Sequence, residues 1–464
     1  MRASPLPFKG RSNCFVWVFA CAMLVPMLAF ASQADGTVAT KASDNTTRVY
    51  GSATTYFTGR QVLDPNDPMS TMFQTPIYQY LTVGADDVGV PGFAIHLSGW
   101  GRLIPTNQAG QLTVTGELMV GNITYTHPKN FLMARAGRQI LYESAGNNIV
   151  MDGFYLKGRP GKSVEISAFG GWVPYQGNNV DLYRGIFGGC LAYRPWDWGN
   201  LGLSYTGQTN HSTFDRSTLG IDYSFRYRRY LEFSGYILTD MVSLGFQETS
   251  NALTYMYKRD WRFTLDYGVY NPSARIAKTS IFSVFTDSKY HKVGADFGYY
   301  GQGWLGASLY GRYFYYDDAN HGYELGFRPV LRFDGAGAGS SVGVEIARLK
   351  GFENAYTQAR AFAIYRPQQL KRLMITADVN NYFYDRAVQG YDVWRRMDPT
   401  GITPYRYIGD GGYFRSHVVS LTAGYEIGKG ARVQGDVAVH VNPDFTQSWS
   451  GLLKFQYDFD LLVK

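Results

Sequence analysis

The stretch LLKFQYDFDLLVK, residues 452–464, decides the fold because its side chains alternate in character. Successive side chains of a β-strand point to opposite faces. One face of this stretch would carry Leu453, Phe455, Tyr457, Phe459, Leu461 and Val463, and the other would carry Lys454, Gln456, Asp458, Asp460, Leu462 and Lys464. A strand with one apolar and one charged face fits either a soluble sandwich or a wall between lipid and water.

The same alternation recurs after residue 45, in segments of about ten residues that turn-forming residues separate. In the segment that begins at Phe93, for example, the alternate set contains His96, Ser98, Trp100 and Arg102. The apolar sets of the four clearest segments are Phe93, Ile95 and Leu97; Leu219, Ile221, Tyr223 and Phe225; Phe263, Leu265, Tyr267 and Val269; and Val433, Gly435, Val437 and Val439. This period indicates an all-β chain.

The composition favours the lipid–water wall. The chain has 464 residues with 53 Gly, 37 Tyr, 29 Phe and 9 Trp, and only 17% of its residues are charged. Soluble proteins carry about 25% charged residues. The mean hydropathy of −0.22 is too polar for a bundle of membrane helices. We therefore predict a transmembrane antiparallel β-barrel, whose strands are apolar on one face only.

The N-terminus predicts export. Arg2, Lys9 and Arg11 precede the apolar stretch CFVWVFACAMLVPMLAFA, residues 14–31, which ends in the small-residue pattern Ala29-Phe30-Ala31. This layout is typical of a secretory signal peptide rather than a membrane anchor. We predict a signal peptide over 1–31 with cleavage after Ala31, a short periplasmic segment over 32–46, and the barrel over 47–464.

Turn chemistry predicts the strand number. Ten short turns fall within 85–91, 127–130, 159–162, 195–200, 227–229, 258–260, 300–303, 334–341, 366–371 and 428–430. Connections that are often longer alternate with them, and the longest are expected over about 58–74, 271–290 and 385–416. Short periplasmic turns and longer outer loops predict about 22 strands, within a range of 18–22, with both termini periplasmic and no plug domain.

Several function classes are disfavoured. Removing the signal peptide leaves 41 basic against 37 acidic residues, a net charge of +4 that is too mild to indicate a nucleic-acid partner. Cys190 alone remains, so the predicted mature chain has no internal disulfide. The seven histidines show no metal-ligand spacing, and Ser204 lies in no nucleophile elbow. We expect no cofactor, no metal and no catalysis.

Aromatic residues near the strand ends predict interfacial girdles, in which Tyr and Trp lie at the level of the lipid headgroups. The alternative is an aromatic track that stacks with sugars inside the barrel. The residues concerned are Trp100, Tyr125, Trp172, Tyr175, Trp196, Trp198, Tyr270, Tyr299, Trp304, Tyr315 and Tyr316.

Charged residues with the polar parity are expected to line the lumen and to set its selectivity. The candidates are Arg102, Arg226, Arg262, Arg312, Arg328, Arg332, Arg360, Arg432, Glu324, Glu345 and Asp436. They form either an arginine track for anionic solutes or ladders of ion pairs that stiffen the wall. Within the track, Arg328 and Arg332 are the first choice because they share one face of one strand.

The stretch ARAGRQILYESAGNNIVMDGFYLKGRP, residues 134–160, resembles an element of alginate-export-like porins. In that element a Gly-Arg-Gln strand end, here Gly137 to Gln139, is followed across a loop by a strand that begins Asp-Gly, here Asp152-Gly153. The resemblance implies a β-barrel with a passive solute pathway. It does not carry alginate over as the substrate, and Arg138 with Asp152 is expected to brace a hairpin.

The size and the signal–barrel layout also resemble the barrel subunits of porin–cytochrome conduits, in which a multihaem cytochrome from another chain fills the barrel. Two functions are therefore expected. The first is a channel of a Gram-negative outer membrane, in contact with outer-membrane lipid, for passive passage of small hydrophilic solutes or ions. The alternative is a sheath or scaffold for a periplasmic or lumenal partner protein.

Overall fold

The computed structural model describes residues 46–63, 71–105, 112–144, 147–174, 180–211, 213–242, 244–258, 260–272, 289–301, 303–317, 320–333, 339–351, 355–388, 413–441 and 448–463. The predicted signal peptide and its cleavage site lie outside these residues. Within this part of the chain, no helix is long and apolar enough to cross a membrane.

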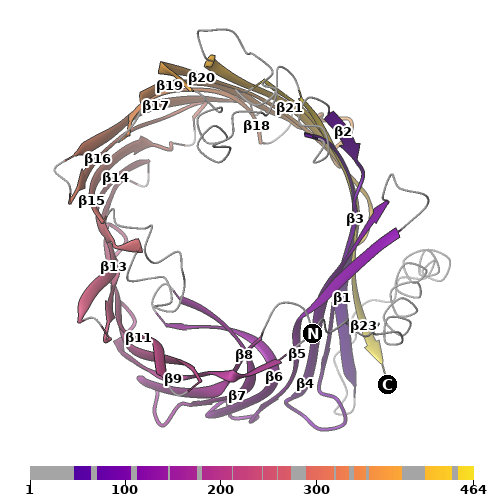
Figure 1. Ribbon diagram of the computed structural model, residues 1–464, viewed down its shortest axis with the longest axis vertical. Helices are drawn as coiled ribbons and strands as arrows, with labels where there is room; N and C mark the ends of the chain where they lie inside the picture. The colour runs from indigo at the N-terminus through magenta and orange to yellow at the C-terminus, as the bar shows by residue number, and fades with distance from the viewer. Residues whose placement is uncertain are drawn as a thin grey trace, which may run out of the picture.

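All of the described secondary structure that builds the wall is β (Figure 1). The first strands are β1 Thr47–Leu63, β2 Thr71–Gln74, β3 Ile77–Asp86, β4 Phe93–Pro105, β5 Leu112–Thr126, β6 Leu132–Ser144, β7 Asn147–Gly158, β8 Val164–Pro174, β9 Val180–Trp196, β10 Gly199–Asn210, β11 Thr213–Tyr227 and β12 Leu231–Asp240. They are followed by β13 Gly245–Tyr257, β14 Trp261–Tyr270, β15 Tyr290–Tyr299, β16 Leu305–Tyr316, β17 His321–Phe333, β18 Ser340–Lys350, β19 Ala355–Tyr365, β20 Leu373–Val388, β21 Tyr413–Gly428, β22 Ala431–Val441 and β23 Ser448–Val463.

The sheet closes on itself because the last strand pairs with the first. β1 pairs antiparallel with β23 along their common length, from Thr47 opposite Val463 to Arg60 opposite Ser450. β2 and β3 both pair with β1 in one continuous register and are interrupted only at Thr75-Pro76, so the 23 elements form a barrel of 22 strands. Proline has no N–H to give to the ladder, which explains the interruption. The predicted barrel and the predicted number of about 22 strands are confirmed.

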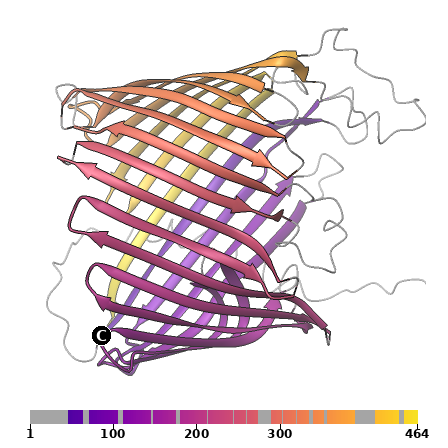
Figure 2. The ribbon, with the colours of Figure 1, turned by 90° about the vertical axis from the view of Figure 1, so that its left-hand side faces the viewer.

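The connections at the two ends of the barrel differ in length (Figure 2). All ten predicted short turns join consecutive strands at one end, where β1 also begins and β23 ends. At the other end the connections are uneven: 271–289 and 389–412 are long, whereas 145–146 and 211–212 are as short as the turns. The expected loops over 58–74 and 385–416 are shorter than predicted, because β1, β2, β20 and β21 continue into them.

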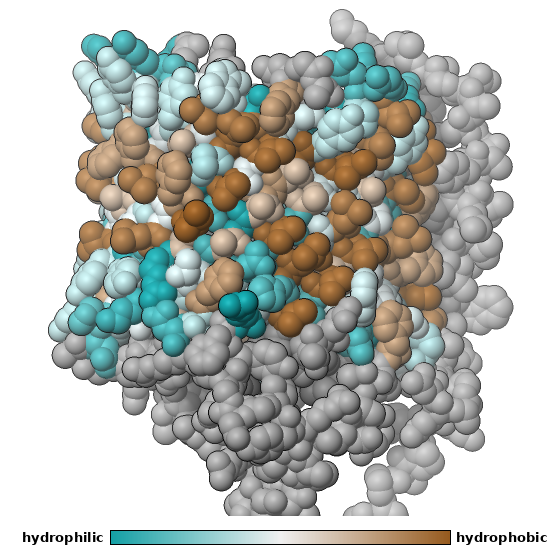
Figure 3. Space-filling view, turned by 90° about the horizontal axis from the view of Figure 1, so that it is seen from above, coloured by the Kyte–Doolittle hydropathy of each residue, from teal (hydrophilic) through white to brown (hydrophobic). Residues whose placement is uncertain are grey.

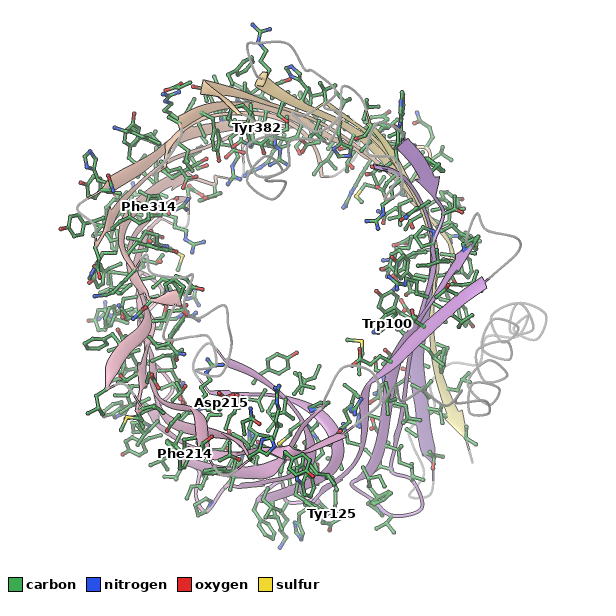
Figure 4. All side chains as sticks on the ribbon, in the orientation of Figure 1. Trp100, Tyr125, Phe214, Asp215, Phe314 and Tyr382 are labelled. Atoms are coloured by element: carbon green, nitrogen blue, oxygen red, sulfur yellow. The ribbon has the colours of Figure 1, made fainter. Side chains whose placement is uncertain are left out.

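The two faces of the wall have the characters that the alternation predicts. On the outer face, side chains such as Leu453, Leu461 and Ile221 are exposed, and brown apolar residues gather in a band between paler and teal ones in Figure 3. The alternate residues point inward; Figure 4 shows Asp215 inside the ring and its neighbour Phe214 outside. An apolar outer band with a polar interior is the pattern of a transmembrane barrel.

One part of the wall, β6 to β10, folds more tightly than the rest; it lies on the lower side of the ring in Figure 1. β6 approaches β9 and β10, although neither is its hydrogen-bonded neighbour. The inward side chains Leu141, Ile149, Met151, Tyr155, Phe169 and Ile186 are buried against each other there. We call this cluster of six residues the corner core.

A row of paired glycines allows the tight fold. Gly137, Gly153 and Gly171 lie opposite one another on β6, β7 and β8. Gly137 has a φ of +116°, and a Cβ on Gly153 would lie 2.3 Å from the Gly170 carbonyl oxygen. These backbones are too close for any side chain, so only glycine fits the row.

The expectation for the stretch 134–160 is therefore wrong in one respect. Gly137 to Gln139 lies in the middle of β6 and Asp152-Gly153 in the middle of β7, whereas the two strands are joined at residues 145–146. The glycines lie within the strands, where they allow the backbones of β6, β7 and β8 to approach closely; we call this row of close backbones the crease. The brace itself is present: the Arg138 guanidinium donates two hydrogen bonds of 2.7 Å to the Asp152 carboxylate and one of 2.9 Å to the Leu118 carbonyl.

The substitution Gly171→Ala tests the crease. The new Cβ would lie 2.4 Å from the Asp152 carbonyl oxygen and 2.7 Å from Gly153 Cα. Overpacking of this kind costs about 1–3 kcal/mol. We expect the folded band in heat-modifiable gel electrophoresis to convert to the unfolded position at a lower temperature. Gly435→Ala is the control, because a Cβ there meets nothing within 4 Å. Equal conversion temperatures for both variants and the unchanged protein would contradict this account.

Candidate functional site

All eleven predicted lumen charges lie on the inward face by strand register. Arg312, for example, pairs with Glu324 and has Gly311 and Tyr313 as its outward neighbours, of which Tyr313 is exposed. The inward position of the others follows from the same alternation along their strands, and concerns Arg102, Arg226, Arg262, Arg328, Arg332, Arg360, Arg432, Glu345 and Asp436. What the structure adds is their partners.

Ion pairs lie on the lumen side of β14 to β17. The Lys292 ammonium lies 2.9 Å from the Asp266 carboxylate. Arg312 donates to Glu324 at 2.9 Å and lies 3.8 Å from Asp296. Each cation is held by carboxylates on the neighbouring strands.

Ion pairs also lie on the lumen side of β18 to β20. Arg360 pairs with Asp378 and lies 3.6 Å from Glu345. The Tyr310 hydroxyl donates a hydrogen bond of 2.8 Å to the Glu345 carboxylate, which is two strands away from it. This reach is possible because the ring lies over Gly326 on the intervening strand, where a Cβ would be 2.2 Å from the ring.

We call Asp266, Lys292, Asp296, Tyr310, Arg312, Glu324, Glu345, Arg360 and Asp378 the paired-charge belt. It contains three cations and five carboxylates, so it offers no excess of positive charge. Two of its side chains lie along the wall over glycines, the Tyr310 ring over Gly326 and the Asp266 carboxylate over Gly294. The sequence left two interpretations of the lumen charges, an arginine track and ladders of ion pairs. The belt corresponds to the ladders.

The remaining candidates are spread over the wall. Arg226 lies 3.0 Å from Glu232 and Arg432 lies 3.8 Å from Glu426, and both arginines are exposed at the end with the short turns. Arg332 donates to the Gly301 carbonyl at 2.7 Å, next to the turn after β15. Asp436 accepts hydrogen bonds from Thr422 and Gln434 on the lumen face. Arg328 and Arg332 share a face as predicted, but only Arg332 is fixed by a hydrogen bond among the described residues.

The predicted girdle residues divide between the two faces. Trp196 and Trp198 stack at 4.6 Å on the outer face, and Tyr125, Trp172, Tyr299, Trp304 and Tyr315 also belong to the outer or rim surface. The girdle prediction is wrong for Trp100, Tyr270 and Tyr316, which share the inward parity; Figure 4 shows Trp100 inside the ring. Tyr175 lies outside the described residues.

Tyr270 and Tyr316 belong to a group of inward aromatic side chains near the end with the long connections. Tyr290 lies 5.6 Å from Tyr270, 6.0 Å from Phe314 and 5.8 Å from Tyr316, measured between ring centroids. We define the aromatic arc as this cluster on β14 to β16 and a second one on β19 and β20, in which Tyr356 lies 5.5 Å from Tyr382 and 6.0 Å from Tyr384.

The lumen histidines and serines make structural contacts. The Tyr50 hydroxyl lies 3.0 Å from His96 Nε2, Ser98 lies 3.0 Å from Thr82, and His440 lies 3.1 Å from Ser450. Among the residues with described positions, no three His, Cys, Asp or Glu side chains come together as a metal site would require.

The chain is similar to several solved outer-membrane barrels. The match with the outer membrane protein OpdK from Pseudomonas aeruginosa covers 89% of this chain and 99% of OpdK, with 10% sequence identity and a TM-score of 0.43. The match with P. aeruginosa OccK9 (OpdG) covers 89% of this chain and 98% of that protein, with 11% identity and a TM-score of 0.43. The match with a chain of the E. coli P pilus tip assembly intermediate PapC-PapD-PapK-PapG covers 92% of this chain and 62% of that chain, with 9% identity and a TM-score of 0.48. No family model matches the chain, and no curated protein matches it.

The substitution Arg312→Gln tests the paired-charge belt. It leaves Glu324 and Asp296 without their cation, and about two thirds of the arginine side chain is shielded from water. We expect a loss of about 1–2 kcal/mol, below the cost of breaking a fully buried pair. The measurement is urea unfolding in detergent, followed by the tryptophan fluorescence.

Arg328→Gln on the next strand is the matched control, because Arg328 makes no ion pair with any described residue. A loss within about 0.5 kcal/mol is expected for it, as for a surface substitution. If both variants lose the same free energy, the belt does not stabilise the wall.

Proposed function

We propose that this protein is a porin-like channel of a Gram-negative outer membrane, through which small hydrophilic solutes or ions pass down their gradients. The observation that carries the proposal is the closed wall of 22 strands with an apolar outer band and a polar inner face. Such a wall separates lipid from a water-filled path. Two lumen-facing side chains, Tyr310 and Asp266, lie along the wall over glycines of the neighbouring strands instead of projecting into the path.

The localisation belongs to the proposal. Residues 1–31 act as a signal peptide that is removed after Ala31, and the mature chain then inserts with both ends of the barrel sequence in the periplasm. The ten short turns at that same end support this orientation, because outer-membrane barrels keep their short turns in the periplasm.

The selectivity is proposed to be weak. The candidates Arg312, Arg360, Glu324 and Glu345 neutralise one another at short range, so the wall offers a moving ion little uncompensated charge. The exposed rim arginines Arg226 and Arg432 are likewise paired, with Glu232 and Glu426, and salt at 0.1 M screens what remains of their field over about 10 Å.

Conductance in planar bilayers tests the channel. We expect purified protein to insert in discrete current steps of uniform size in potassium chloride, with a reversal potential in a salt gradient that indicates only a weak cation preference. The reason is a polar path whose paired-charge belt holds three cations against five carboxylates. Barrels that are folded, as judged from their heat-modifiable mobility, and yet silent in repeated preparations would overturn the proposal.

A second function, a sheath for a partner protein, is favoured by the strand number. Barrels of 22 strands enclose a lumen wide enough for a plug. No described residue forms one, so a partner chain would have to supply it. Tagged protein extracted from its native membrane in mild detergent would then retain a lumenal partner, and a haem-stained band would identify a cytochrome. Recovery of the barrel alone would leave the channel as the function.

A further inference from the structure

The aromatic arc faces water rather than lipid, and this separates it from a girdle. On β16 the run Tyr313 to Tyr316 places Tyr313 and Tyr315 on the outer face, where both are exposed, and Phe314 and Tyr316 on the lumen face. Figure 4 labels one member of each lumen cluster, Phe314 and Tyr382, on the wall of the ring. Large apolar rings on the wet face need a reason other than anchoring in lipid.

The rings are held in defined orientations. Within each cluster the ring planes cross at 43° to 76°, with centroids 5.5 to 6.0 Å apart. These are edge-to-face and tilted contacts, which pack the edge of one ring on the face of the next. All seven rings are half-buried, so each keeps part of its surface toward the lumen.

The space between the two clusters is chemically distinct. Phe314 pairs across the sheet with Gly322, which has no side chain. The neighbouring row runs from Arg312 through Glu324 and Leu349 to Tyr356 and Tyr384. The carboxylate of Glu324, already bound to Arg312, therefore lies between the two groups of rings on the paired-charge belt.

This combination matches the chemistry of a sugar. A pyranose ring presents an apolar C–H face that packs on an aromatic ring, and hydroxyls that need donors and acceptors at its edge. The tyrosine hydroxyls and the carboxylates and guanidiniums of the belt supply both. Every cation of the belt is bound to carboxylates, so the belt itself offers no free positive charge for an anionic solute.

We propose that the aromatic arc is a binding surface for neutral oligosaccharides, at which two sugar rings stack on the clusters around Tyr290 and Tyr356. The proposal rests on the channel function and specifies its solute class. The solute enters at the end with the long connections, stacks on the arc and then passes the paired-charge belt.

Current block by oligosaccharides tests the arc. Maltohexaose and cellohexaose, added to single channels in planar bilayers, are expected to produce brief, concentration-dependent interruptions of the current. Tyr290→Leu and Tyr356→Leu each remove one stacking ring. We expect each to weaken the apparent affinity about twofold to twelvefold, since one aromatic contact is worth about 0.5–1.5 kcal/mol. Tyr290→Phe keeps the ring and is expected to keep most of the affinity.

Tyr313→Leu and Tyr315→Leu are matched controls, because they remove rings from the outer face of the strand that carries Phe314 and Tyr316. Both should leave the block unchanged. Calorimetric titration of the detergent-solubilised protein with maltohexaose is a second readout that requires no conductance. It distinguishes rejection of the channel function from rejection of the sugar-binding surface. A barrel that conducts no current but binds the sugar would contradict the first proposal and support the second.

Three results would overturn the inference. The first is conductance with neither block nor heat of binding at millimolar sugar. The second is equal loss of block in the lumen and outer-face variants. The third is block by an oligouronate or an aromatic carboxylate but not by a neutral sugar, which would assign the lumen to anionic solutes.

Discussion

The need to pair every backbone N–H and C=O group in hydrocarbon is the constraint on which this structure depends. Lipid offers these groups no partners, so a sheet that crosses it cannot have a free edge. The ladder between β1 and β23 removes the edge, and it joins residues from opposite ends of the sequence. Alternation then assigns every other side chain to lipid and the rest to water. The apolar outer band, the polar lumen and the end-to-end hairpins all follow from this closure.

Closure also explains how the lumen accommodates its charged side chains. A polar side chain on a strand can either project into the water or lie along the wall, and here glycines on neighbouring strands favour the second. The Asp266 carboxylate covers Gly294, and the Tyr310 ring covers Gly326 on its way to Glu345. Charges that lie flat reach partners on adjacent strands, and this produces a belt of paired charges instead of a row of free cations. The large number of glycines in the sequence thus serves the lumen as well as the turns.

The sequence was sufficient for the closed barrel, the strand number and the inward face, because period two and turn chemistry act locally. It was insufficient where the answer depends on which residues of neighbouring strands lie beside each other. The partners of Arg312 and Arg360 follow from strand register, which one sequence does not contain. Gly137 predicts a strand end but lies within β6, since the sequence does not distinguish a glycine that permits close backbones from one that permits a turn. The lumen orientation of Tyr316 is predictable from sequence, because Tyr315 and Tyr316 are adjacent in a strand and cannot point to the same face.

The corner core has a consequence for how the barrel assembles. Over most of the rest of the wall the aliphatic side chains point outward, where lipid surrounds them. In the corner, residues from Leu141 to Ile186 bury one another on the inner side, and they come from strands that follow each other along the chain. Contacts of short sequence separation form early. The β6–β9 segment can therefore bury apolar side chains on its inner side independently of the lipid that covers its outer face.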